Sequence, residues 1–235
     1  LLLFCFFVKV QMYVNLKVWR LTVYKHFIKR LFDTVISLLA IVILSPIFLI
    51  TAIAVKFTSS GPVIFKQRRI GLGGKEFNIY KFRSMTQNAE HIGSGVYSGK
   101  GDTRVTNVGR IIRATSIDEL PQVVNILKGD MSLIGPRPPL TYHPWSIEKY
   151  TQEQRRMFDV RPGITGWAQV HGRKDVEWNK RIELNVWYVD HVSFLLDVKI
   201  FFMTILKVAT NADNENTGET VVKTEDVKEK ETVIK

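Results

Sequence analysis

The sequence predicts an α+β protein that is mostly helical, with one membrane-embedded helix near its start and a small β-hairpin after it. Three observations favour this class. Residues 34–55 carry no charged side chain, and such a helix is about as long as a bilayer core is thick. Residues 62–85 alternate apolar and polar side chains around a glycine-rich centre, as the strands of a hairpin do. Farther along the chain, apolar residues recur mainly at helical spacing.

Composition and charge indicate an anionic partner. The 235 residues hold 33 Lys and Arg against 22 Asp and Glu, a net charge of +11. Residues 211–235 contain seven acids and four lysines, so residues 1–210 carry +14. Such a charge implies nucleic acid, lipid headgroups or phosphorylated substrates. No nucleic-acid recognition motif is visible and the apolar run favours lipid, so we expect anionic membrane lipid and no nucleic acid.

The chain divides into four expected segments. Residues 1–28 mix aromatic and basic side chains and give no clear structural prediction. Residues 29–57 are expected to form the membrane helix, and residues 58–210 a folded domain at the membrane surface. Residues 211–235 are polar, charged and free of aromatic side chains, a composition typical of disorder.

The apolar run allows two topologies. Its length alone favours a transmembrane helix. However, Pro46 stands at its centre, where proline removes a helical hydrogen bond and bends the chain, and Ser45 is placed to satisfy the carbonyl that is freed. Basic residues also flank both ends of the run: Lys29 and Arg30 precede it, and Lys56 and Lys66 follow it. Because cytoplasmic loops are enriched in Lys and Arg, both ends carry the cytoplasmic pattern. A helix that enters, bends and returns fits both observations. Asp33 is expected to form a structural ion pair with Lys29 or Arg30 at the headgroup level.

The hairpin over residues 62–85 has its turn at Gly71, Gly73 and Gly74. A phosphate-cradling loop is the less favoured interpretation of these glycines, because no Gly-Lys-Ser/Thr follows them. The basic residues of the hairpin form either a solvated strand face or a contact surface for phosphate. They are Lys66, Arg68, Arg69, Lys81 and Arg83.

The rest of the chain is predicted to be loops and helices. Residues 86–108 are polar and glycine-rich, as loops that cover a site often are. Residues 109–128 have helical spacing with a glycine stop at Gly129. A second helical stretch is expected near 145–159, and a rigid loop over 161–173. Residues 177–209 predict one or two amphipathic helices, the last with one lipid-facing side.

Asp118 and Glu119 are adjacent carboxylates in an otherwise apolar run. One interpretation is helix capping, because Ser116 and Glu119 have capping-box spacing. Pro121 is acceptable only in a first helical turn, so both acids lie at the mouth of a helix. Arginines before and after them, among them Arg113, suit phosphate binding there. Carboxylates in such a place bind Mg²⁺, which bridges acids to substrate phosphates. Acid, metal and arginine together indicate a phosphoryl-transfer site.

The motifs now resemble those of a known family. KRLFD at 29–33, the Ser45-Pro46 break, QRRIG at 67–71, KFRSM at 81–85, RATSIDELPQ at 113–122, GDMSLIGPRP at 129–138 and RPGITGWAQVHGR at 161–173 are similar to the bacterial sugar transferases. These are monotopic polyprenyl-phosphate phosphoglycosyl transferases, and the chain resembles their short form over residues 29–209.

The resemblance implies a reaction and a location. Such enzymes move sugar-1-phosphate from a UDP-sugar to undecaprenyl (polyprenyl) phosphate, release UMP, and so begin capsule, exopolysaccharide or glycan assembly. It implies a re-entrant helix, a monotopic protein on the cytoplasmic face of the inner membrane, Mg²⁺ as cofactor, and a homodimer as one assembly to test. The alternatives are a membrane-bound glycosyltransferase that releases UDP and a non-enzymatic, membrane-tethered polyanion-binding protein.

The resemblance also implies residue roles. Asp118 would be a nucleophile that forms a phosphosugar-aspartyl intermediate, and Glu119 would bind Mg²⁺ together with it. The expected phosphate and substrate ligands are Arg113, Arg137, Lys81, Arg83 and Arg68. Two positions depart from the family pattern: His171 stands where many members have Asn, and Asn185 where many have Asp. We therefore assign no catalytic role to Asn185.

Overall fold

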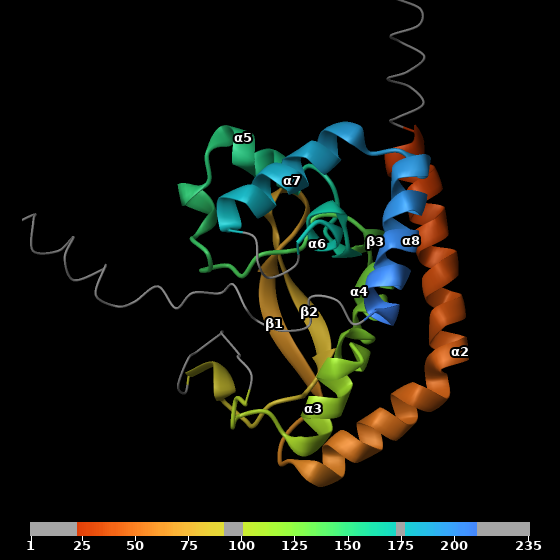
Figure 1. The fold of residues 1–235 in the computed structure, drawn as a ribbon, viewed down its shortest axis with the longest axis vertical. Coiled ribbons are helices and arrows are strands. Elements are labelled where there is room, and N and C mark those ends of the chain that lie inside the picture. The colour runs from red at the N-terminus through yellow and green to blue at the C-terminus, as the bar shows by residue number, and fades with distance from the viewer. Residues whose placement is uncertain (1–22, 92–100, 173–176, 211–235) are drawn as a thin grey trace, which may run out of the picture.

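The computed structural model describes residues 23–91, 101–172 and 177–210. A long helix, α2 (Lys29–Thr58), runs along one edge of the molecule and follows a π-helical turn at Tyr24–Ile28. An antiparallel hairpin, β1 (Ile64–Ile70) and β2 (Glu76–Phe82), lies at the centre (Figure 1). The α+β class with a mostly helical chain is confirmed. Residues 1–22 of the first expected segment and all of the last, 211–235, lie outside the described residues.

Helix α2 bends midway, as Figure 1 shows, and contains Pro46. Proline lacks the N–H that would bond the carbonyl of Val42. The Ser45 hydroxyl donates to that carbonyl at 2.8 Å instead, as predicted from the Ser-Pro pair. Most of the apolar side chains of α2 are exposed, and the helix is long and apolar enough to cross a membrane. An exposed apolar helix of this kind needs an apolar surrounding.

The predicted ion pair of Asp33 with Lys29 or Arg30 is wrong. Asp33 is buried and accepts the backbone N–H of Leu133 at 2.9 Å. Lys29 pairs instead with Asp197. Arg30 donates to the carbonyls of residues 126 and 127, at a helix C-terminus, where unsatisfied carbonyls attract cations. These three side chains therefore fix the start of α2 to residues 126–133 and to Asp197.

The hairpin confirms the prediction for residues 62–85. The register pairs Ile64 with Phe82 and Ile70 with Glu76. Gly73 (φ 63°) and Gly74 (φ 76°) occupy the left-handed region in the turn, which glycine adopts without strain.

The predicted helix over 109–128 is two helices with a break. Helix α3 (Asn107–Ala114) ends before Ser116, whose φ of 57° no helix allows. A 3₁₀ turn at Ile117–Glu119 follows, and then α4 (Gln122–Lys128). Ser116 makes no side-chain cap, so the capping-box interpretation is wrong. Gly129 (φ 92°) ends α4 as expected.

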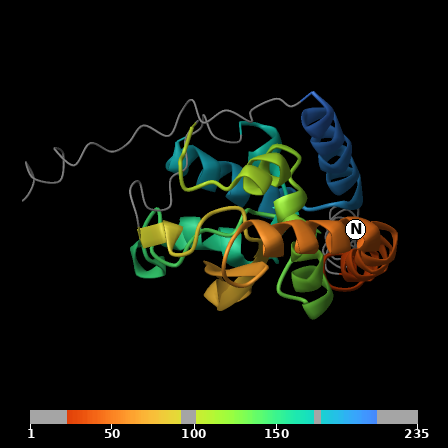
Figure 2. The same ribbon diagram turned by 90° about the horizontal axis from the view of Figure 1, so that it is seen from below.

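The later helices partly follow the prediction. The stretch near 145–159 is broken into 3₁₀ turns at Ile147–Lys149 and Arg156–Phe158 around α5 (Gln152–Arg155). Residues 177–209 form two helices, α7 (Trp178–His191) and α8 (Phe194–Ala209), with Ser193 capping α8. Figure 2 shows α8 diverging from α2, and much of its apolar surface is exposed.

A second, parallel sheet was not predicted. Strand β3 (Ser132–Ile134) pairs with β4 (Gly163–Thr165), and the short helix α6 (Trp167–Val170) follows. The backbones meet so closely that a Cβ on Gly163 would lie 2.1 Å from the nitrogen of Gly135. Glycine is therefore required there, and the segment predicted as a rigid loop is fixed against residues 129–138.

Candidate active site

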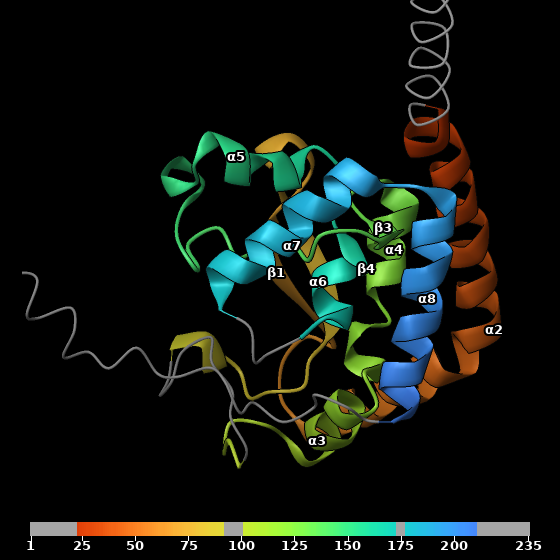
Figure 3. The same cartoon turned by 45° about the horizontal axis from the view of Figure 1, so that its top comes forward.

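A cavity of about 280 Å³ lies between the hairpin and helices α6 and α7. Figure 3 shows both helices on one side of β1 and β2. Five cationic side chains and two carboxylates are among its lining residues, so positive charge is in excess there and favours an anionic ligand. The charged lining residues are Arg69, Lys81, Arg113, Asp118, Glu119, Arg137 and Arg181.

Glu119 is fixed from two sides. Its Oε1 accepts Lys81 Nζ at 2.8 Å and Arg137 Nη2 at 3.1 Å. Its side chain is 14% exposed, and a mostly buried carboxylate needs such partners. Both the 3₁₀ turn and the left-handed Ser116 before it aim this side chain into the cavity. The predicted proximity of Glu119, Lys81 and Arg137 is therefore observed.

Asp118 lines the same cavity but makes no hydrogen bond or ion pair with the described residues. Burial raises the pKa of its carboxyl, and the neighbouring Glu119 raises it further. The positive charges of Lys81, Arg113 and Arg137 oppose this shift. A carboxylate that is desolvated and unbonded is a better nucleophile than one held by two cations.

Lys81 is positioned by hydrogen bonds between the backbone of its strand and the side chain of Asn125. Asn125 of α4 is fully buried; its amide donates to the carbonyl of Asn78 at 2.7 Å and accepts the N–H of Tyr80 at 3.0 Å. These bonds hold β2 against α4. Lys81, the next residue of β2, is thereby held beside the turn that carries the dyad. Burial lowers the pKa of Lys81, against the opposing charge of Glu119.

Arg137 lies in the proline-rich segment after β3, which Arg69 stabilises. Arg69 donates to the carbonyl of Pro138 at 3.1 Å and to Gln67 at 2.5 Å. Burial, and then the charge of Arg137, lower the pKa of Arg69 to about 10. Two guanidinium groups held together in this way fit a polyanion such as a diphosphate.

Two of the predicted phosphate ligands, Arg83 and Arg68, do not line the cavity. Arg83 is 6% exposed, donates to Ser59 and to the carbonyl of Pro62 beyond the C-terminal end of α2, and does not line the cavity. Arg68 has a 75% exposed side chain and pairs with Glu76 at 3.4 Å. It does not line the cavity. Both predictions placed basic residues correctly on the hairpin but could not tell which way each one faces.

Arg69 was not among the predicted ligands, and strand parity could have found it. Lys81 pairs with Phe65 in the hairpin register. Side chains alternate between faces along a strand, so the odd-numbered residues of β1 share the face of Lys81. Arg69 belongs to that face and Arg68 to the opposite one.

The two residues that depart from the family pattern, Asn185 and His171, lie in different parts of the molecule. Asn185 lines the cavity and is 4% exposed. His171 is exposed and lies against the ring of Trp167, with centroids 3.7 Å apart. Other lining residues that the sequence did not single out for the site include Tyr150, Gln169 and Arg181, because segments distant in the chain bring them together.

A second cavity of about 170 Å³ adjoins the first and shares Ser116, Glu119, Arg137 and Gln169 with it. Its other lining residues are mostly apolar and come from α3, α4 and the residue before Pro121, from β4 and α6, and from α8. They are Ala114, Leu120, Val123, Ile164, Thr165, Val170, Thr204, Lys207 and Val208. The dyad therefore lies between a charged cavity and a more apolar one.

The two carboxylates fit a divalent ion of the kind that binds substrate phosphates. Mg²⁺ is commonly held by one or two carboxylates, with phosphate oxygens and water completing the shell. Asp118 has no bonding partner among the described residues, and Glu119 lies next to it. The described residues contain no cluster of three or more metal-binding side chains, so a substrate would have to supply the remaining ligands.

Comparison with known proteins identifies the family. The bacterial sugar transferase family matches residues 24–211. A Bacillus subtilis (strain 168) protein described as the uncharacterized sugar transferase EpsL is 46% identical over 191 residues, 81% of this chain and 92% of that protein.

Two further relatives are longer proteins. The UDP-N-acetylgalactosamine-undecaprenyl-phosphate N-acetylgalactosaminephosphotransferase of Aeromonas hydrophila is 46% identical over 187 residues, 78% of this chain and 44% of that protein. The UDP-glucose:undecaprenyl-phosphate glucose-1-phosphate transferase of Klebsiella pneumoniae is 44% identical over 186 residues, 76% of this chain and 39% of that protein. This chain thus spans less than half the length of these two relatives. The match over nearly all of the described residues shows that the chain belongs to the bacterial sugar transferase family.

Proposed function

We propose that this protein transfers sugar-1-phosphate from a UDP-sugar to undecaprenyl (polyprenyl) phosphate, the kind of reaction for which two of its relatives are named, and that it does so at the cytoplasmic face of the membrane. The observation that carries this proposal is the unequal pair of carboxylates. Glu119 is held by Lys81 and Arg137, whereas Asp118 has no bonding partner among the described residues. One acid is thus positioned and the other is available to react.

The reaction proceeds in two displacements. An Asp118 carboxylate oxygen attacks the sugar-bearing phosphorus of the donor, the bond from that phosphorus to the bridging oxygen breaks, and UMP leaves with that oxygen. A phosphate oxygen of the acceptor then attacks the same phosphorus. The aspartyl bond breaks, the new diphosphate forms, and Asp118 is a carboxylate again.

The surrounding side chains stabilise the charge that moves in these steps. Arg69, Arg113 and Arg137 neutralise the diphosphate as negative charge develops on the leaving group. Glu119 takes the proton from an acceptor phosphate that arrives singly protonated and releases it to water after the transfer. Bound Mg²⁺ would be held by Asp118 and Glu119 and would supply further charge neutralisation at the phosphates.

The apolar features of the molecule support a lipid acceptor. The second cavity opens from the dyad toward α8, whose exposed side includes Phe201, Phe202 and Leu206. We propose that α2 is re-entrant and bends at Pro46 within the cytoplasmic leaflet. Basic residues beside such an anchor attract anionic lipid, by about 1 kcal/mol each. The anchor would hold the dyad at the headgroup plane, where a lipid phosphate and a soluble nucleotide meet.

The product nucleotide tests the reaction. Purified protein, a UDP-sugar, undecaprenyl phosphate and Mg²⁺ are expected to give UMP and a lipid-linked diphosphate sugar. Release of UDP would indicate a glycosyltransferase instead. No nucleotide release with any UDP-sugar of a panel would favour a binding protein.

The intermediate tests the mechanism. Protein incubated with donor alone, then quenched and digested, is expected to show the added mass of a phosphosugar on the peptide that contains Asp118. Asp118→Ala is expected to abolish both the adduct and UMP release, with membrane association unchanged. An adduct on another residue would overturn the assignment of the nucleophile.

A further inference from the structure

Two polar groups in the main cavity have no hydrogen-bond partner among the described residues. They are the hydroxyl of Tyr150, a residue 3% exposed, and Oδ1 of Asn185, a residue 4% exposed. A buried polar atom without a partner is destabilising, and proteins keep few of them. Both residues line the cavity, whereas the two unpartnered atoms are themselves buried, so a ligand there supplies the missing bonds once these side chains turn toward it.

These two groups belong to one wall of the cavity. Asn185 shares a face of α7 with Trp178, Arg181 and Ile182, because these positions follow helical spacing and all line the cavity. Tyr150 packs with Ile182 in one buried cluster. We call Tyr150, Trp178, Arg181, Ile182 and Asn185 the α7 wall.

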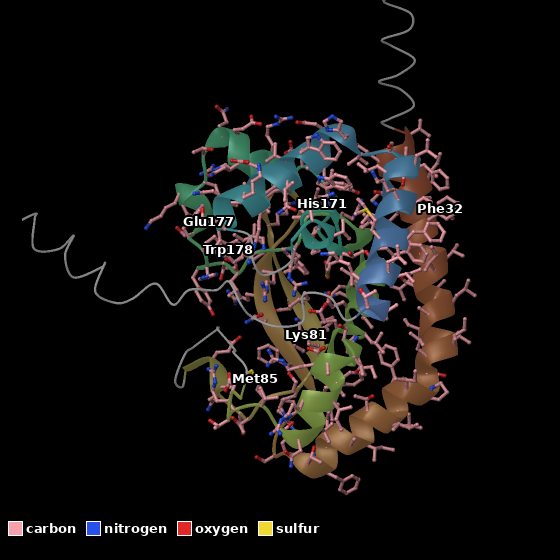
Figure 4. All side chains as sticks on the ribbon, viewed as in Figure 1. Phe32, Lys81, Met85, His171, Glu177 and Trp178 are labelled. Carbon is pink, nitrogen blue, oxygen red and sulfur yellow. The ribbon has the colours of Figure 1, made fainter. Side chains whose placement is uncertain are left out.

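The α7 wall differs chemically from the dyad side. Figure 4 labels Lys81 on the hairpin and Trp178 at the start of α7, which line the cavity from different elements. The α7 wall offers an aromatic ring, an amide and a hydroxyl. The guanidinium of Arg181 lies 4.8 Å from the Trp178 ring centroid and the His143 ring lies 5.2 Å from it, which fixes that ring from two sides.

Such groups suit a planar, uncharged heterocycle and its sugar. An amide combines a donor and an acceptor and matches the imide edge of uracil. An aromatic ring stacks on a base. Burial raises the pKa of Tyr150 to about 12, so its hydroxyl keeps its proton and donates.

Position separates the nucleoside from the transferred sugar. The transferred sugar is attached to the phosphorus that meets Asp118, whereas the nucleoside lies one phosphate farther away. Ser116, Glu119, Arg137 and Gln169 line both cavities and mark the dyad end. Tyr150 and Asn185 line the main cavity from other elements, the turn before α5 and helix α7, and not from the 3₁₀ turn that carries Asp118.

We propose that the α7 wall is the nucleoside subsite, in which Tyr150 and Asn185 bind the uridine portion of the donor and of the leaving UMP. This inference rests on the proposed function, because it assumes a UDP-sugar as donor. It assigns Asn185 a role in affinity and none in the displacement, so an uncharged residue at this position is compatible with turnover.

Titration with UMP in a calorimeter tests the subsite directly on the full chain in detergent. Tyr150→Phe and Asn185→Leu are each expected to weaken UMP binding by about three- to tenfold, and to leave the affinity for inorganic pyrophosphate unchanged. Tyr80→Phe on the outer face of the hairpin and Asn179→Leu on the exposed side of α7 are the matched controls, with wild-type affinity expected.

Thermal unfolding provides a second measurement that a structural role would reverse. Removing a hydroxyl without a partner does not cost a hydrogen bond, so the unfolding midpoint of Tyr150→Phe is expected at or above that of the wild type. A lowered midpoint together with unchanged UMP affinity would make Tyr150 structural and overturn the proposal.

The remaining outcomes are also decisive. Unchanged UMP affinity with a raised KM for the UDP-sugar would assign the wall to the transferred sugar and overturn the nucleoside assignment. Equal losses for UMP and pyrophosphate would assign it to the phosphates. If the wild type turns over and both variants bind UMP with normal affinity, only this inference is refuted. If the wild type never releases UMP, the proposed function is refuted.

Discussion

Lys81 Nζ donates to Glu119 Oε1 at 2.8 Å, and this ion pair joins the second strand of the hairpin to the turn that carries the two carboxylates. Both side chains are mostly buried, at 17% and 14% exposed. Removing one partner of a buried pair leaves the other charge poorly compensated. The pair therefore connects the fold of the hairpin to the chemistry of the dyad.

Lys81→Met is expected to lower turnover by about 100-fold or more, because a positioned charge at a phosphoryl-transfer site is lost. Arg137 still pairs with Glu119, so the protein is expected to fold. Steady-state UMP release measures the effect. Lys66→Met is the control, because Lys66 lies on the exposed face of the hairpin over Tyr80. If both variants turned over within threefold of the wild-type rate, the role of Lys81 in the site would be refuted.

Adjacent arginines of β1 provide a matched pair. Arg69→Met is expected to raise the KM for the UDP-sugar by about 10- to 100-fold, since a hydrogen bond to a charged group contributes about 1.5–3 kcal/mol. Arg68→Met is expected to stay within twofold, because Arg68 faces solvent and pairs with Glu76. Similar effects of the two substitutions would contradict the strand-parity assignment.

Asp118→Asn is expected to raise the thermal stability at pH 7.5. Burial raises the pKa of this carboxyl in the folded state, so the folded protein binds the proton to a higher pH than the unfolded chain does. The free energy of unfolding therefore falls as the pH rises between these two pKa values. The advantage of the Asn variant should shrink as the pH falls through the raised folded-state pKa and should be lost below the unfolded pKa of about 3.9, where both states are protonated.

The same shift predicts the acidic limb of the pH–activity profile. The carboxylate is the reactive form of Asp118, so wild-type turnover is expected to fall as the pH decreases through a pKa above the ordinary value of an aspartate. UMP release measured from pH 4 to pH 8 gives this limb. A limb at or below the ordinary aspartate pKa, or normal turnover by Asp118→Asn, would argue against Asp118 as the nucleophile.

Arg83→Met separates a structural arginine from a catalytic one. Arg83 donates to the carbonyl of Ser59 at 2.6 Å and to its hydroxyl at 2.8 Å, and these acceptors would be left buried without it. We expect the free energy of unfolding to fall by about 1–3 kcal/mol and the KM for the UDP-sugar to remain unchanged. A raised KM at normal stability would restore Arg83 as a substrate ligand.

Topology follows from the bend in α2. Tags at residue 20 and residue 235 are both expected to be protected from a membrane-impermeant label outside the cell. Pro46→Leu restores the N–H that the carbonyl of Val42 lacks, and is expected to expose the residue-20 tag in part of the population. External labelling of one wild-type tag alone would favour a full span.

Local features of this chain could be predicted because their causes lie within a few residues. Gly73 and Gly74 fix the hairpin turn through their own backbone freedom. Ser45 bonds the carbonyl of Val42 because proline frees it three residues away. The site was predicted in part for the same reason, because adjacent carboxylates with arginines nearby in the sequence indicate phosphate chemistry.

Other features had no local cause. The parallel pairing of β3 with β4 depends on segments that are far apart in the chain and are short enough to look like loops. Ser116 breaks the predicted helix with a left-handed backbone that its sequence neighbours do not require. Asp33 found its partner at Leu133 instead of one turn away, because docking of α2 buried it.

By itself, the sequence determined that this chain has an apolar helix with a proline bend, a basic hairpin and a carboxylate pair among arginines. Covalent geometry, side-chain charge and neighbouring hydrogen bonds are sufficient for these. Only the tertiary structure decided that Arg69 faces the dyad while Arg83 holds α2, and that Tyr150 and Asn185 share a wall of one cavity. Which face of an element is buried depends on the apolar surfaces of distant segments, and those meet only when the whole chain folds.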